Sequence, residues 1–135
     1  MKNTYFLEAS DVKAMAAAAE AEAQRHGWAV SIAIADAGGH LLWLQRLDGA
    51  PPATARIAPA KANTAALGRR ESRVYEEVIN AGRYAFLSAP GLEGMLEGGV
   101  PVMRDGQCLG AVGVSGVKSS DDAQVARAAI AALGL

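Results

Sequence analysis

The sequence is poor in several residue types, and each shortage excludes a class of protein. Its one cysteine, Cys108, rules out an internal disulfide and fits a reducing compartment. The 13 Lys and Arg residues are balanced by 14 Asp and Glu residues, so the basic excess typical of nucleic-acid-binding proteins is missing. No apolar run reaches the roughly 18 residues of a membrane-spanning helix, and the first residues lack the apolar core of a signal peptide. We therefore expect a cytoplasmic protein that binds neither nucleic acid nor membranes.

Aromatic residues are also scarce, at 5% of the 135 residues, although hydrophobic residues make up 51%. Much of this hydrophobic content is alanine, which favours helices and close packing but buries little area per residue. The length corresponds to one domain spanning residues 1–135. Because a core of this kind is thin, we expect the chain to gain stability as a homo-oligomer.

The hydrophobic periodicity predicts elements in the order α-β-β-α-α-β-β-β-α. Helices are expected over residues 10–26, 53–68 and 71–82 and from Ser119 onward. Strands are expected over residues 28–36 and 41–48, near residues 95–97, and on both sides of the turn Arg104-Asp105-Gly106. Adjacent strands joined by tight turns form an antiparallel sheet, and helices packed on such a sheet give an α+β domain.

Residues 97–116, EGGVPVMRDGQCLGAVGVSG, contain six of the fifteen glycines. Gly110, Gly113 and Gly116 recur every third residue inside a predicted strand, which matches neither the dinucleotide-binding nor the Walker phosphate pattern. Glycine within a strand commonly marks the close approach of another backbone or of a ligand. We expect one strand face to carry Leu109, Ala111, Gly113 and Ser115, and we favour a helix packed on it over the floor of a pocket.

Lys61 is the charged residue that stands out, because Ala60 and Ala62 flank it in an alanine-rich helix. Such a lysine either extends its amine to the surface or points into a pocket. In a pocket it could bind a carboxylate, or act as a base or nucleophile. The turn at Gly98-Gly99 is either a plain tight turn or a set of backbone amides that hold an anion.

These residues suggest one candidate function, that of an enzyme or binding protein for a small carboxylated or hydroxylated catabolite. Lys61 and the amides of Gly98 and Gly99 would hold the carboxylate, and Glu97 would move a proton. Arg104 is a further partner for an anion. Of the other charged residues, Asp36, Arg46 and Asp48 also flank predicted turns or strand ends, where a site could assemble.

The chain has two histidines, His26 and His40. His26 falls in the last turn of the first helix, where a positive charge suits the helix dipole. His40 closes the first hairpin and is a candidate ligand, with a solvated turn residue as the alternative. No paired spacing of His and Cys is present, so we expect no metal site of the zinc type.

Five motifs, taken in order, resemble the haem-binding GlcG/HbpS-like family. They are DAGGHLL (36–42), RLDGA (46–50), PAKANTAA (59–66), EGGVPV (97–102) and GAVGVSG (110–116). The resemblance covers almost the whole chain and implies a profilin-like α+β domain that assembles into dimers or larger oligomers. It also implies haem binding and a link to glycolate or diol catabolism.

By the same resemblance, Lys61, Glu97, Gly98 and Gly99 fall in the pocket of the family. A haem site needs an axial ligand such as His, Cys, Met or Tyr, together with an apolar slot. With few aromatic and many small residues, a deep crevice within one subunit is hard to build. We therefore expect haem at a surface or inter-subunit site that uses His40.

Overall fold

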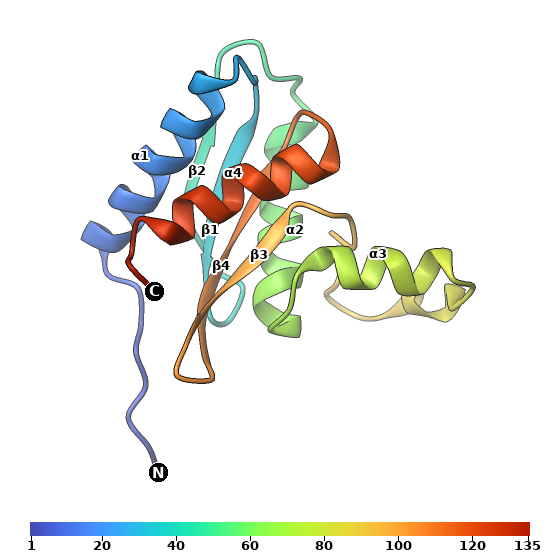
Figure 1. Ribbon diagram of the computed structural model, residues 1–135. Helices are drawn as coiled ribbons and strands as arrows, with labels where there is room; N and C mark the ends of the chain where they lie inside the picture. Colours follow the sequence, from blue (N-terminus) through green and yellow to red (C-terminus); the bar gives the residue numbers. More distant parts are fainter.

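A computed structural model describes residues 1–135 and shows four strands, four α-helices and one 3-10 helix (Figure 1). In chain order these are α1 (Ala9–Arg25), β1 (Ser31–Asp36), β2 (Leu41–Arg46), α2 (Thr54–Gly68), α3 (Ser72–Asn80), η1 (Tyr84–Ser88), β3 (Gly99–Arg104), β4 (Gln107–Ser115) and α4 (Ser119–Ala131). The predicted α+β class is confirmed. None of the helices is both long and apolar enough to cross a membrane.

The element order agrees with the prediction except before β3, where the expected short strand near residues 95–97 is absent. The backbone of this segment bonds to side chains instead of to a neighbouring strand. The Gly94 amide donates to Thr64 Oγ1 at 3.1 Å, and the Leu96 carbonyl accepts a hydrogen bond from Ser72 Oγ. The polar groups that a strand would pair are thus taken up by α2 and α3.

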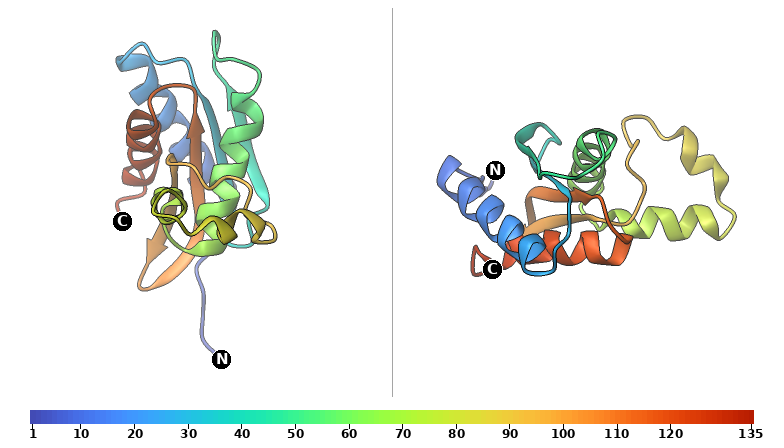
Figure 2. Two further views of the ribbon diagram at one scale, coloured as in Figure 1. Left: turned by 90° about the vertical axis from the view of Figure 1, so that its right-hand side faces the viewer. Right: turned by 90° about the horizontal axis from the view of Figure 1, so that it is seen from above.

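The four strands form one antiparallel sheet in the order β2-β1-β4-β3. Figure 2 shows α1 and α4 on one face of this sheet and α2 on the other. The strand residues alternate between a bulky face and a thin face. The bulky face, under α1 and α4, includes Ile32, Ile34, Val112 and Val114. The thin face, under α2, includes Ala33, Ala35 and Ala111.

Helix α2 lies directly against Gly113 of β4. A Cβ atom built there would lie 2.1 Å from the carbonyl oxygen of Ala58 and 2.5 Å from the amide nitrogen of Ala62. Helix packing, rather than a pocket floor, therefore explains this glycine, as the sequence favoured. The predicted placement of Leu109 on the same face is wrong. A register shift opposite Val102 and Met103 turns Leu109 into the core under α1.

Helix α1 begins one residue before the predicted Ser10, because Glu8 rather than Ser10 caps it. The Glu8 amide donates to Asp11 Oδ2 at 2.8 Å, and the Glu8 side chain accepts a hydrogen bond from the backbone amide of Asp11. This reciprocal pairing gives a hydrogen-bond acceptor to two backbone amides at the helix start. Asp11 also gives this helix an acidic first turn.

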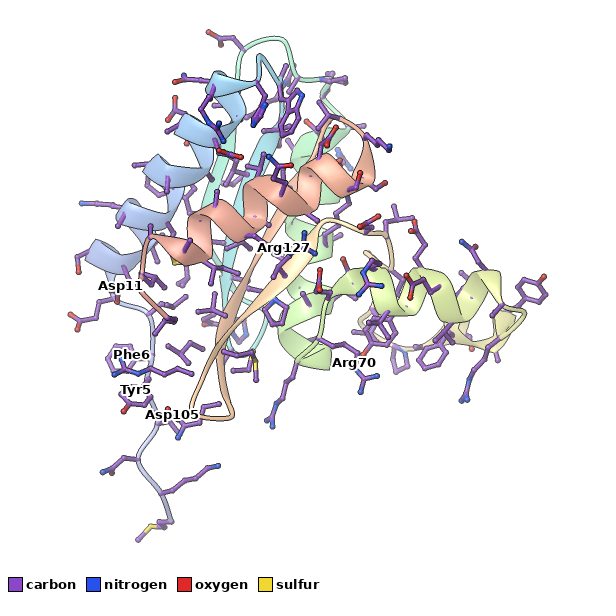
Figure 3. All side chains as sticks on the ribbon, viewed as in Figure 1. Tyr5, Phe6, Asp11, Arg70, Asp105 and Arg127 are labelled. Carbon is purple, nitrogen blue, oxygen red and sulfur yellow. The ribbon has the colours of Figure 1, made fainter.

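The segment of residues 72–90, which contains α3 and η1, projects from the side of the domain and is called the arm below (Figures 1 and 2). Its base is held by an ion pair between Glu71 and Arg127 of α4, and Figure 3 shows Arg127 directed at the start of α3. Further out, large apolar side chains reach solvent. Tyr84 is 66% exposed and Leu87 is 67% exposed.

Candidate functional site

Lys61 is buried, with only 3% of its surface exposed, between α2, α4 and the end of β4. Its ammonium group donates to the Val114 carbonyl at 2.9 Å and to Asp122 Oδ2 at 3.2 Å. Neither expected position, at the surface or in an open pocket, is the one observed. The carboxylate that this lysine binds belongs to the protein itself, so the ammonium group serves to join α2 to α4.

The double-glycine turn lies against Lys61, as the sequence predicted. A Cβ at Gly98 would come within 2.7 Å of the lysine nitrogen, and a Cβ at Gly99 within 2.3 Å of the Lys61 carbonyl oxygen. The turn is nevertheless closed to an anion at Gly99, whose buried amide donates to Ser72 Oγ at 2.8 Å. The plain tight turn, made necessary by the close approach of α2, accounts for both glycines.

Glu97 is half-buried and precedes this turn, but it forms no hydrogen bond or ion pair with Lys61. Its charge acts on Arg73 of α3, and it is one of the groups that raise the pKa of that residue, after Glu77 and Glu71. The catalytic arrangement expected from the sequence, with Lys61 holding a carboxylate beside a proton-moving Glu97, therefore lacks a free lysine.

Arg104 lies at the far end of β3, five residues beyond Gly99, or about 16 Å along an extended strand. Its guanidinium group stacks over the ring of Tyr5 at 4.1 Å, while the Tyr5 amide donates to Gln107. Figure 3 shows Tyr5 and Phe6 beside the hairpin tip that carries Asp105. Arg104 thus fastens the N-terminal segment to this hairpin and does not share a site with Lys61.

His40 lies in the turn between β1 and β2, and its side chain is 82% exposed. Its Nδ1 atom is 3.2 Å from Asp36 Oδ1, and the same oxygen accepts the backbone amides of Gly38 and His40 at 2.9 Å. Burial alone would raise the pKa of Asp36, but these two amides and the imidazole outweigh it, and the pKa is lowered. The aspartate stays ionised and orients the ring.

This orientation leaves the Nε2 atom of His40 without a protein partner and directed away from Asp36. A histidine whose other ring nitrogen is held by a carboxylate is the usual form of a metal-ligating histidine, because the carboxylate fixes the tautomer and raises the basicity of the ligand. The other histidine differs. His26 Nε2 already contacts Glu22 and Gln124, and its ring stacks on Trp28.

Three exposed leucines lie to one side of the His40 turn. Leu41 and Leu44 lie on the α2 side of the sheet, since they pair with Ala35 and Ala33, which pack on α2. Leu67 of α2 approaches the same turn, 3.4 Å from a Cβ built at Gly39. These three side chains, here called the leucine patch, are 43–52% exposed. An apolar surface therefore adjoins an oriented, free imidazole nitrogen.

The comparisons with known proteins agree with the five sequence motifs. Residues 7–131 match the family described as haem degrading protein HbpS-like. The chain is 56% identical to Protein GlcG of Escherichia coli K12 over 115 residues, which is 85% of each chain.

The chain belongs to the HbpS-like family. Among solved structures, a double mutant of Streptomyces reticuli HbpS superimposes with a TM-score of 0.89 at 31% identity, over 100% of this chain and 92% of that one. The structure described as the PduOC:heme complex superimposes with a TM-score of 0.86 at 30% identity, over 95% of each chain. The family predicted from the sequence motifs is thereby confirmed.

The sequence reasoning missed two features of the structure. The first is Asp122 of α4, the partner of Lys61, which the sequence analysis did not single out. The second is the meeting of Arg46 and Asp48 in one hollow at the opposite end of β2 from His40. Both residues had been noted beside a turn, but their spacing did not show which other elements would face them.

Proposed function

We propose that the protein binds haem at its surface, with His40 as the axial ligand. The observation that carries the proposal is the imidazole held by Asp36 with its Nε2 atom free, next to the leucine patch. A haem site requires an axial ligand and apolar contacts, and this turn offers both. Membership of a family described as haem degrading, and the likeness to a heme complex, support the same ligand.

The residues around His40 also suit the porphyrin ring and the propionate groups of haem. The leucine patch would contact the apolar porphyrin, while Arg69, exposed at the end of α2 and engaged in no ion pair, would attract a propionate. When bound, haem supplies a redox-active iron. The contribution of the protein is to hold that iron through one oriented nitrogen and to shield one side of the ring from water.

Hemin titration followed by the Soret band tests this proposal. We expect a saturable shift for the native chain, and at least tenfold weaker binding for His40→Ala. His26→Ala is the matched control and should bind like the native chain, because its imidazole is already engaged. Asp36→Asn should weaken binding less than His40→Ala. The absence of a saturable shift, or equal affinity of His40→Ala and the native chain, would overturn the proposal.

The catabolite-binding alternative finds no support at Lys61, whose ammonium is taken up by Asp122. We also propose that the chain acts as a cytoplasmic homo-oligomer, supported by the exposed apolar residues of the arm. The link to glycolate or diol catabolism comes from the family resemblance and stays a prediction.

A further inference from the structure

A hollow of about 430 Å³ lies between the C-terminal end of α1 and the end of β2, at the opposite end of the β1–β2 hairpin from His40. In Figure 1 this is the upper end of α1, beside the loop that leads from β2 to α2. The volume falls in the range of small-molecule sites. Its wall includes Trp28, Arg46 and Asp48, together with polar side chains of α1 and β2.

Arg46 and Asp48 are two opposite charges that line this hollow without pairing. Neither takes part in any ion pair of the chain. The Arg46 Nε atom donates to the Ala50 carbonyl at 2.9 Å, which fixes the guanidinium group and leaves its two terminal nitrogens unbonded. A fixed guanidinium with free terminal nitrogens matches the geometry of a carboxylate.

The remaining polar groups are arranged around Glu20. Its carboxylate accepts the side-chain amides of Gln24, at 3.2 Å, and Gln45, at 3.0 Å. These contacts use the amide nitrogens and leave both amide oxygens as acceptors. Together with Asp48, the hollow therefore offers a second carboxylate and two carbonyl oxygens, a set that suits an ammonium group.

Trp28 provides the apolar wall. Its ring stacks on His26 with a centroid separation of 4.2 Å and an interplanar angle of 17°, which holds the indole in place. The charges limit the ligand further. Glu20 and Asp48 repel a simple anion, and Arg46 repels a simple cation, so the favoured ligand carries both signs.

We propose that this hollow binds a small zwitterion of the α-amino acid class. The ligand carboxylate would lie on Arg46, its ammonium group toward Asp48 and Glu20, and its side chain against Trp28. The site is separate from the haem site at His40, because the six-residue strand β2 divides them by about 20 Å.

The test is a titration with each of the twenty common amino acids, followed by tryptophan fluorescence in a Trp43→Phe background, where Trp28 is the only indole. We expect saturable binding of at least one amino acid. Its analogues lacking the amine or the carboxylate should bind at least tenfold more weakly. Failure of all twenty to give a saturable change, or equal binding of a singly charged analogue, would overturn the proposal.

Variants locate the site. Arg46→Gln and Asp48→Asn should each weaken binding at least tenfold, whereas Arg56→Gln and Asp105→Asn, at exposed positions outside the hollow, should not. Far-UV circular dichroism and thermal melting establish that each variant is folded. Amino acid binding that survives both hollow variants would contradict this location. Hemin binding by Arg46→Gln should be unchanged, so this proposal and the haem proposal fail separately.

Discussion

Lys61 and Asp122 form an ion pair in which both side chains are almost fully buried, at 4% and 3% exposure. Burial raises the pKa of Asp122, although the Lys61 ammonium and the backbone amides of Val117 and Gly116 favour its ionised form. A buried pair is costly to form, and it is more costly to break, because one charge then remains without a partner. Its role is to fix how α2 and α4 meet at the end of β4.

A double-mutant cycle measures this coupling. Lys61→Met and Asp122→Asn should each lower the free energy of unfolding by about 3–5 kcal/mol, since each leaves a buried polar group unpaired. The double variant should cost less than the sum of the two. Urea denaturation provides the values, and Lys118→Met, at an exposed position, serves as the control. Additive single effects would show that the two residues act independently.

The sequence identified Lys61 as unusual but not its partner. Its alanine-rich helical neighbourhood suggested either a surface amine or an open pocket, and the observed burial against Asp122 is neither. The partner lies 61 residues away on another helix. Helical periodicity gives the face on which a residue lies, whereas the crossing of α4 over β4 decides which side chain meets it. A local pattern cannot supply that crossing.

Among the elements, α1 and α4 lie side by side on the bulky face of the sheet and are joined by Glu22. Its carboxylate accepts hydrogen bonds from Arg25 and, at 2.8 Å, from Gln124 of α4. These two bonds, with the charges of Arg25 and His26, outweigh desolvation and lower the pKa of Glu22 from 4.5 to about 2. The ionised form is therefore the one that links the helices.

Acid should weaken this link. Because the pKa of Glu22 is lower in the folded chain, its contribution to stability is complete above about pH 4.5 and is lost as the pH falls toward 2. Glu22→Gln should flatten the fall in the free energy of unfolding over this interval. Denaturant titrations at a series of pH values provide the comparison. Glu93→Gln, exposed in the loop before β3, is the control and should keep the slope of the native chain.

Most of the elements could be predicted from the sequence. The exception, the strand expected near residues 95–97, shows what a local pattern does not contain. The helices and the four strands follow from apolar periodicity and glycine-containing turns, which are local signals. Residues 95–97 were expected to form a strand, but the Leu96 carbonyl accepts a hydrogen bond from Ser72, and the preceding Gly94 amide donates to Thr64. Such contacts depend on the tertiary structure, and no local pattern indicates them.

At the scale of the whole molecule, the fold of a single copy does not explain why the arm exposes large apolar side chains. Tyr84 and Leu87 are about two-thirds exposed on a segment that leaves the body of the domain. Exposed apolar side chains gathered on one projection are typical of an interface. The thin, alanine-rich core points the same way, since oligomerisation adds buried area that the domain lacks.

Sedimentation velocity tests this expectation. The native chain should sediment as a dimer or larger species, and Leu87→Glu should shift it toward the monomer, because a charge in an apolar contact is costly. Leu42→Glu, an exposed leucine of β2 away from the arm, is the matched control and should leave the assembly unchanged. A native chain that is monomeric at all concentrations would contradict the proposed homo-oligomer.

The most direct measurement of the proposed function is a crystal structure of the chain with hemin bound. The account predicts that the iron is bonded to His40 Nε2, that Asp36 remains on Nδ1, and that the porphyrin rests on the leucine patch. Iron bound by any other residue, or hemin seated away from the β1–β2 turn, would contradict it.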